Sequence, residues 1–307
     1  MRSSRLTACL LWALALLPSL LQSGCRPGSS EEGGKLIVAV SVLPQKYFVE
    51  KIAGDSIDIF VVVPPGANPA TYEPSPSDMR KMSSAAVWFT IGVPFETPWL
   101  PRFTGSSTDL RIRSTIENIE RLPIDRYTAA GRETLPGHQD HDGGSPDPHV
   151  WLAPELVRSQ AAVIADELSL LDRSGANGYT NNLNVFNTEI DSLQKAIRLL
   201  IDTGSSGSFI VFHPAWGYFA DEFGLIQIPI ETAGSEPSPR EMSLLVDYAR
   251  ENDIRAVFVS PQFSTSSAAS IAAEIGAAVD YIDPLEEDWG SNLIKVAELL
   301  SGLRNPE

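Results

Sequence analysis

Cysteine is nearly absent from this chain. Its 307 residues include two cysteines, Cys9 and Cys25. We expect Cys9 to be removed with an N-terminal signal, so the mature protein keeps Cys25 alone and forms no internal disulfide. A zinc site built from several thiolates is excluded for the same reason. Any metal ion must therefore be held by histidine, carboxylate or water.

Long apolar runs are also absent. No segment approaches the roughly 20 residues that a membrane-spanning helix needs. The apolar run Ala8–Leu21 follows Arg2 and Arg5 and ends shortly before Cys25. A basic start, a short apolar stretch and a small residue before a cysteine are typical of a lipoprotein signal. We therefore expect residues 1–24 to be a signal peptide and Cys25 to be lipidated, with ordinary cleavage that leaves a free Cys25 as the alternative.

Basic residues are few compared with acidic residues. Lysine and arginine total 23 against 39 aspartates and glutamates, which gives a formal net charge of −16. Such a field repels nucleic acid and anionic membrane surfaces and concentrates cations around the protein. We expect no nucleic-acid partner, and membrane attachment only through the lipid anchor. An acidic surface that keeps an exported protein soluble explains the charge equally well.

Three common catalytic or phosphate-binding patterns are missing as well. The sequence has no His-Glu-x-x-His, no Gly-x-Ser-x-Gly and no phosphate-binding glycine loop. We therefore expect a binding protein and not an enzyme. A zinc hydrolase with three protein ligands and one water is the remote alternative.

The chain does contain a regular alternation of strand and helix patterns. Apolar segments rich in β-branched residues predict strands at 36–42, 57–63, 86–91, 209–212, 227–230, 256–260 and 278–282. Helical patterns separate these segments, which is typical of parallel sheets. The sequence therefore predicts an α/β fold with two parallel-sheet lobes.

A long helical stretch lies between the two sets of strands. From about 179 to 201, apolar residues recur at spacings of three and four. We predict a long, rigid connecting helix, with a metal cleft between the lobes. The predicted order is a tether at 25–34, an N-terminal lobe at 35–154 with an exposed, mobile loop at 131–148, connecting helices at 155–205 and a C-terminal lobe at 206–307.

Three widely separated segments end an apolar run at a metal-ligand side chain beside a proline. They are Asp147–Trp151, Val211–Pro214 and Tyr281–Pro284, which carry His149, His213 and Asp283. Two imidazoles and a carboxylate suit zinc or manganese. Ligands of open parallel sheets bind beyond the carboxyl ends of the strands, where His213 and Asp283 are expected. We therefore predict a metal site; the alternatives are satisfied or exposed imidazoles and a turn aspartate.

Further motifs extend this pattern along the chain. They are PGANP at 65–69, YEPSPSD at 72–78, DPHVWL at 147–152, HPAWGYF at 213–219, EPSP at 236–239, PQFS at 261–264 and DPL at 283–285. Together they resemble the solute-binding proteins of zinc and manganese ABC importers, the metal-binding lipoprotein and adhesin family, from Leu36 to about Leu303. The resemblance implies two α/β lobes, a rigid connecting helix and one transition-metal ion in the cleft.

The resemblance places His149, His213 and Asp283 on three of the family's four ligand positions. An imidazole at His213 favours zinc over manganese, since manganese-binding relatives usually carry glutamate at that position. Zinc is therefore the expected cargo and manganese the second choice.

The fourth ligand position differs from the family pattern. The family pattern at this position is Pro-His-x-Tyr-Glu-Pro, whereas this chain has Ala70 where the first histidine is expected. A methyl group cannot coordinate a metal. Water, Glu73, or His138 or His141 from the loop could complete the site; loss of tight metal binding is the alternative.

The expected function follows from the ligand set and the resemblance. We expect an extracytoplasmic, lipid-anchored monomer, or a periplasmic one if Cys25 is not lipidated, that captures Zn²⁺ and delivers it to the membrane permease of an ABC importer. The alternative is a metal-weakened relative that serves as an adhesin or as a receptor for another small ligand.

Overall fold

The structure is a computed structural model that describes residues 35–106, 109–124, 145–204, 207–231, 234–263 and 265–302. The chain separates into the units Met1–Gly34 and Lys35–Glu307, and the description below concerns the second unit. The predicted signal peptide, tether and Cys25 lie outside the described residues. Among the described helices, none is both long and apolar enough to cross a membrane.

The first sheet has four parallel strands in the order β2-β1-β3-β4. They are β1 (Leu36–Val40), β2 (Ile57–Val61), β3 (Val87–Thr90) and β4 (Arg111–Ser114). The two central strands β1 and β3 are continuous apolar runs, as expected for strands that are covered on both faces. The edge strand β4 alternates charged and apolar residues, a pattern that protects an edge from further pairing.

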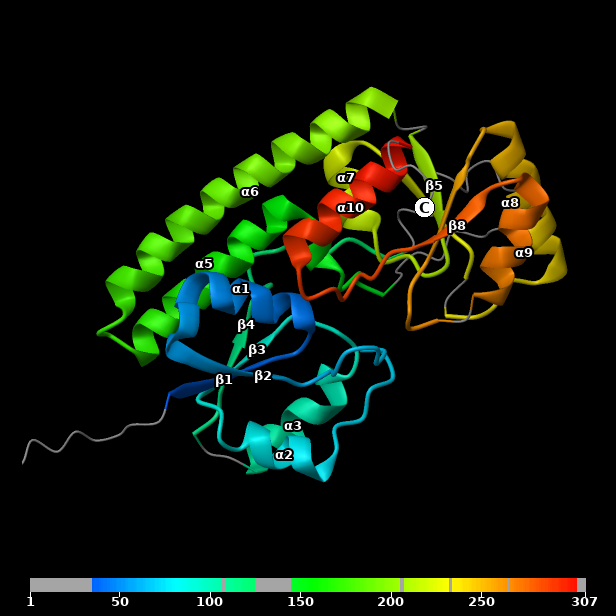
Figure 1. Cartoon of the computed structure of the whole chain (residues 1–307). Coiled ribbons are helices and arrows are strands. Elements are labelled where there is room, and N and C mark those ends of the chain that lie inside the picture. The colour runs from blue at the N-terminus through cyan, green and yellow to red at the C-terminus, as the bar shows by residue number, and fades with distance from the viewer. Residues whose placement is uncertain are drawn as a thin grey trace, which may run out of the picture. The chain divides into compact units, whose positions relative to one another are not determined.

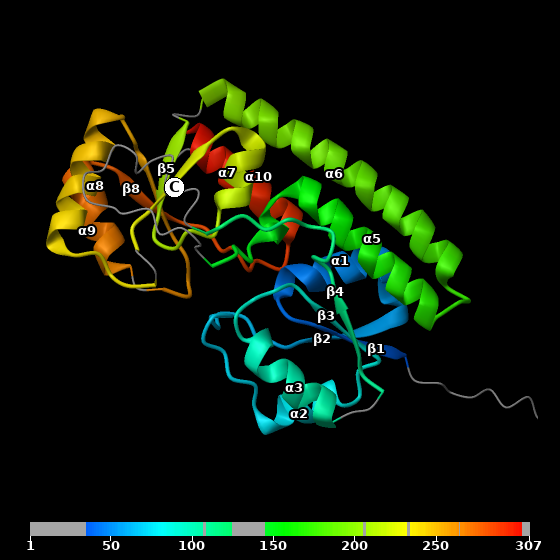
Figure 2. The same ribbon diagram turned by 180° about the vertical axis from the view of Figure 1, so that it is seen from behind.

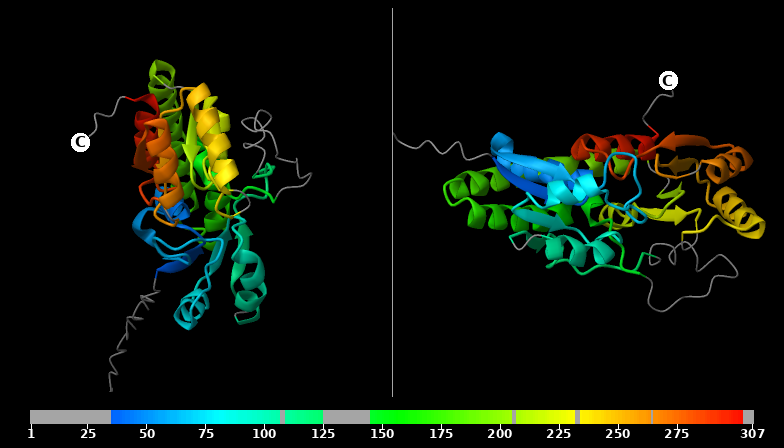
Figure 3. Two further views of the ribbon diagram at one scale, coloured as in Figure 1. Left: turned by 90° about the vertical axis from the view of Figure 1, so that its right-hand side faces the viewer. Right: turned by 90° about the horizontal axis from the view of Figure 1, so that it is seen from below.

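Helices cover both faces of this sheet. Helix α1 (Leu43–Ala53) lies on one face and buries Phe48, Val49 and Ile52, while α2 (Pro76–Met82) and α3 (Glu96–Ser106) lie on the other (Figures 1 and 3). The sequence pattern did not reveal α3 or β4. Two prolines, at 98 and 101, and a glycine at 105 obscure the helical period of α3.

Two long helices lead from this sheet to the second half of the chain. Helix α5 (Pro154–Leu171) begins one residue before the predicted connecting segment, and α6 (Ala176–Gly204) begins three residues before its predicted start. With 29 residues, α6 is about 43 Å long at the α-helical rise per residue. It runs past α5 and α1 to the start of the second sheet, which confirms the prediction of a long connecting helix (Figures 1 and 2).

The second sheet repeats the topology of the first, with the order β6-β5-β7-β8. Its strands are β5 (Ser208–Val211), β6 (Ile226–Pro229), β7 (Ala256–Val259) and β8 (Ala278–Tyr281), and its helices are α7 (Gly217–Phe223), α8 (Pro239–Glu251) and α9 (Ser266–Ile275). Helices α8 and α9 lie together on the side of the sheet away from α6 (Figure 1). Two parallel-sheet α/β lobes are thus confirmed.

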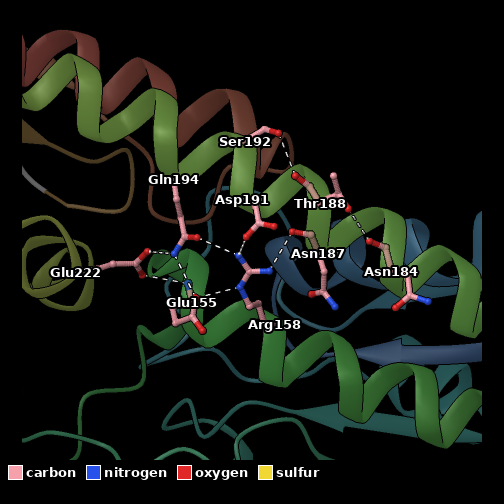
Figure 4. Close-up of polar contacts among 9 residues, drawn as sticks. All are labelled: Glu155, Arg158, Asn184, Asn187, Thr188, Asp191, Ser192, Gln194 and Glu222. Atoms are coloured by element: carbon pink, nitrogen blue, oxygen red, sulfur yellow. Dashed lines mark hydrogen bonds and ion pairs between the residues drawn. The ribbon is translucent and has the colours of Figure 1, made fainter.

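A network around Arg158 joins α5, α6 and α7. Its guanidinium donates to Asn187 O and to Gln194 Oε1, both at 3.0 Å, and pairs with Asp191 (Figure 4). Gln194 Nε2 in turn donates to Glu222 Oε1 of α7 at 2.7 Å. Because α7 belongs to the second lobe, these bonds tie that lobe to the connecting helices.

The last helix, α10 (Trp289–Ser301), packs against α6, and its N-terminal end lies near α1 (Figures 1 and 2). Trp289 meets Phe48 edge to face, with ring centroids 5.3 Å apart, and also contacts Phe186 of α6. Its Nε1 donates to Trp151 O at 2.6 Å. One large core therefore includes residues from both sheets, and a smaller core lies beneath α8 and α9. The domain limits predicted from the sequence stay predictions.

A buried carboxyl group lies at the carboxyl edge of the first sheet. Glu96 accepts hydrogen bonds from Ser41 Oγ at 2.6 Å, from Ile91 N at 2.8 Å and from Gly92 N at 2.7 Å. Burial raises the pKa of Glu96 to about 7, although these three hydrogen bonds and the charge of Arg121 favour the ionised form. Ionisation of this group therefore opposes folding in the neutral range.

We expect Glu96 to make the protein less stable as the pH rises. The folded-state pKa of about 7 lies above 4.5, the ordinary pKa of a glutamate side chain. Its contribution to stability is therefore present below pH 4.5 and is lost as the pH rises through 7. The effect is on the order of 1–3 kcal/mol. Urea unfolding between pH 5 and pH 8 should show a steeper fall for the wild type than for Glu96→Gln, with the exposed Glu117→Gln as control. Equal slopes for all three proteins would contradict this assignment.

Candidate metal centre

His213 lies directly beyond the end of β5. Phe212 N donates to Phe258 O at 3.0 Å, which continues the ladder between β5 and β7 up to the residue before the histidine. The imidazole stacks on the ring of Phe263, with centroids 4.7 Å apart and planes 21° apart. Its Nδ1 lies 2.6 Å from Oε1 of Glu231, a residue that follows β6.

His149 is held by the segment just before α5. Asp147 N donates to Leu122 O at 2.8 Å, and Tyr218 of α7 donates from its hydroxyl to Asp147 O at 3.2 Å. Oδ1 of Asp147 lies 2.7 Å from His149 Nδ1 and accepts from His149 N at 2.9 Å. The short helix Val150–Leu152 that follows is fully buried and keeps the segment in place.

The structure brings the two predicted imidazoles together. The ring centroids of His149 and His213 lie 5.1 Å apart at an interplanar angle of 72°. Burial lowers the pKa of His213, and the nearby His149 adds to the fall, while Glu231 opposes it. The shift favours the neutral form of His213, which is the form that can donate a lone pair to a metal ion.

Asp283 lies beyond the end of β8, at the same edge of the second sheet as His213. Its Oδ1 accepts from Gln262 Nε2 at 2.9 Å and from Leu285 N at 2.8 Å. The neighbouring Pro284 O accepts from Trp151 Nε1 at 2.7 Å, so the segments that carry His149 and Asp283 are directly bonded.

Within the described residues, no three side chains of His, Cys, Asp or Glu lie close enough together to hold a metal ion. The imidazoles form a pair, and Asp283 does not complete a triad with them. A cavity of about 10 Å³ beside His213 reaches Pro284, the residue after Asp283; this is about the space of one water molecule. Coordination by all three predicted ligands thus requires the segments to shift around the ion.

The auxiliary ligands predicted from the sequence are not part of this pair. Glu73 is exposed in the loop between β2 and α2. His138 and His141 lie outside the described residues. Of the segment 131–148, the structure describes 145–148, where Ile124 N donates to Ser145 O at 3.0 Å and Asp147 is fully buried.

Sequence reasoning missed the two carboxylates that contact the imidazoles as functional residues. Glu231 follows β6 as His213 follows β5, so its place after a strand was the available signal. Asp147 was visible only as part of a motif. Gln262, which donates to Asp283, likewise belonged to a motif without an assigned role.

Comparisons with known proteins agree with this architecture. The family model described as "Zinc-uptake complex component A periplasmic" (ZnuA) matches residues 38–298. The high-affinity zinc uptake system protein ZnuA of Bacillus subtilis is 27% identical over 288 residues, which cover 92% of this chain and 87% of that protein. The manganese-binding lipoprotein MntA of Halalkalibacterium halodurans is 28% identical over 267 residues, which cover 84% of this chain and 83% of that protein.

Solved structures show the same relationship. A crystal structure of ZnuA is 39% identical to this chain and superposes with a TM-score of 0.79, covering 88% of this chain and 99% of the other. The family model also spans both sheets, the connecting helices and the two histidines. This chain belongs to the ZnuA family of periplasmic zinc-uptake components.

Proposed function

We propose that this protein captures a divalent transition metal, with Zn²⁺ as its main cargo, and delivers it to the membrane permease of an ABC importer. The observation that carries the proposal is the pair His149 and His213, which come from distant parts of the chain and lie with ring centroids 5.1 Å apart. Zinc uptake and manganese binding are the named roles of the relatives in Bacillus subtilis and Halalkalibacterium halodurans.

The donor set favours zinc over manganese. Two imidazoles suit zinc, whereas manganese prefers carboxylate, carbonyl and water oxygens. Asp283 would supply the third ligand when the ion is bound, from the strand end next to the small cavity at His213. The acidic surface of the protein concentrates cations of either kind and does not choose between them.

Direct titration tests the proposal. The purified unit Lys35–Glu307 should bind one Zn²⁺ with sub-micromolar affinity and bind Mn²⁺ more weakly, as measured by calorimetry or with a competing chelator. A variant with both His138 and His141 changed to alanine shows whether these two side chains contribute. No binding at micromolar zinc would refute the capture function and favour a receptor for another ligand or an adhesin.

We infer that Ala70 replaces a ligand histidine and leaves the fourth position to water. Ala70 is exposed in the loop after β2, and its N donates to Asn68 Oδ1 at 2.8 Å. Pro69 O accepts from Phe95 N at 3.3 Å, which anchors the loop to the first lobe. Three protein ligands and a water are a known arrangement for zinc.

Restoring the histidine should strengthen zinc binding. We expect Ala70→His to increase the zinc affinity about tenfold, or about 1.4 kcal/mol, because an imidazole then replaces water. Thr71→His is the matched control, since Thr71 is the exposed neighbour in the same loop. Equal affinities for the wild type and both variants would show that Ala70 does not face the bound metal.

The remaining proposals concern how the protein reaches its partner. The N-terminal pattern supports export, cleavage after residue 24 and lipidation of Cys25, which would keep a monomeric capture protein close to its permease. Metabolic labelling with a radioactive fatty acid should mark the wild type and not Cys25→Ser. A labelled Cys25→Ser protein would rule out Cys25 as the acylated residue.

A further inference from the structure

Each of the three predicted metal ligands is bonded to a partner at one atom. Glu231 contacts His213 at Nδ1, Asp147 contacts His149 at Nδ1, and Gln262 donates to Oδ1 of Asp283. In an imidazole, the two ring nitrogens point to opposite sides of the ring. A partner at Nδ1 therefore leaves Nε2 as the nitrogen that can bind an ion.

Backbone hydrogen bonds hold Glu231 beside His213 in the second lobe. Its own N donates to Phe212 O at 3.1 Å, and Ile230 N donates to Val211 O at 2.8 Å, so the backbone after β6 is hydrogen-bonded to the end of β5. The side chain is 7% exposed. A carboxylate buried to this degree requires a donor, and Nδ1–H of His213 at 2.6 Å provides one.

The ring of His213 is also restrained in its plane. Phe263 stacks on it at a centroid distance of 4.7 Å. Stacking fixes the plane of the ring and still allows a 180° flip, which would exchange Nδ1 with Cδ2 and Nε2 with Cε1. Glu231 removes this freedom, because the flipped ring would present a carbon atom to the carboxylate.

Asp147 repeats the arrangement at His149 with one difference. It is fully buried, its Oδ1 contacts both N and Nδ1 of His149, and its Oδ2 has no hydrogen-bond partner among the described residues. An unpaired oxygen on a buried carboxylate is costly.

We propose that Glu231 is a positioning residue that keeps the proton of His213 on Nδ1, so that Nε2 is the only nitrogen offered to the cargo ion, and that Asp147 does the same for His149. The proposal rests on the proposed metal-capture function, because Nε2 acts as a ligand atom only if the protein binds a metal ion. The proton position itself is a property of the metal-free protein. Hydrogen bonds of this kind orient metal-binding histidines and increase their basicity.

The first test measures the proton position without metal. Two-bond nitrogen–proton correlation spectra of ¹⁵N-histidine protein, recorded at mildly alkaline pH where an ordinary imidazole is neutral, should show both rings protonated at Nδ1. Single His→Gln variants assign the signals. Glu231→Ala should move His213 towards the Nε2–H form that a free imidazole prefers, while Glu231→Gln, which keeps an acceptor oxygen, should retain Nδ1–H. Protonation of His213 at Nε2 in the wild type would overturn the proposal.

The second test measures affinity. Glu231→Ala should weaken zinc binding by about 10- to 100-fold, and Glu231→Gln by less. Glu251→Ala, which removes an exposed glutamate of α8 and so makes the net charge less negative by the same amount, should leave the affinity unchanged. An affinity of Glu231→Ala equal to that of the wild type would overturn the positioning role. If the wild type bound no zinc, the capture function would fail and the spectra would still decide the proton position.

Discussion

Replacing His213 with alanine should remove most of the zinc affinity. Structural zinc sites with four ligands bind with about 10–16 kcal/mol, so a single ligand accounts for roughly 3 kcal/mol, or a factor of at least ~100 in affinity. The loss is large here because we infer only three protein ligands, and His213 is one of two imidazoles. Calorimetry against a competing chelator measures the change.

Two controls separate ligand loss from misfolding. His138→Ala removes an imidazole from the protein without touching the His149–His213 pair, and we expect it to bind zinc far more tightly than His213→Ala. Thermal unfolding without metal should show that His213→Ala is folded. An unchanged isotherm for a folded His213→Ala protein would remove this residue from the site.

Replacing Trp289 with alanine should cause the largest loss of stability. Its side chain is 2% exposed, meets Phe48 at 5.3 Å, and donates to Trp151 O. Loss of so much buried surface costs about 3–5 kcal/mol, and the carbonyl of Trp151 loses its donor as well. Urea unfolding followed by circular dichroism measures the difference in free energy.

Two control variants separate the contribution of the Trp289 N–H donor from that of its buried apolar surface. Trp289→Phe keeps most of the apolar surface and loses the N–H donor, so it should cost about 1–2 kcal/mol. Trp99→Ala removes a half-buried tryptophan from α3 and should cost less than Trp289→Ala. A loss below about 1 kcal/mol for Trp289→Ala would show that α10 contributes little to the shared core.

Much of the fold could be predicted because its central strands are covered on both faces. Such strands are continuous apolar runs, and β1 and β5 have no polar residue inside that would hide them. Helix α5 lies where the sequence predicts connecting helices, and Pro154 marks its start. The element missed at the sheet edge, β4, has only four residues and alternates arginine with other side chains, so its pattern is too short to be distinguished from a loop.

The site was predictable in its residue types and less so in its contacts. Proline after each strand end made His213 and Asp283 visible, and their places beyond β5 and β8 agree with the prediction. The contact of His213 with Glu231 depends on the order of β5 and β6 in the sheet, which the sequence alone does not reveal. Nor could the sequence show that Asp283 does not form a group of three ligands with the two imidazoles in the described structure.

The return of α10 to the first lobe has a consequence for the order in which the protein can fold. Chains are synthesised from the N-terminus at about 5–20 residues per second, and the surface formed by α1 and α6 receives its cover, Trp289, near the very end. Until then Phe48 and Phe186 lack an aromatic neighbour that they have in the finished protein. The core around α1 and α6 is therefore completed only after the last helix has been made.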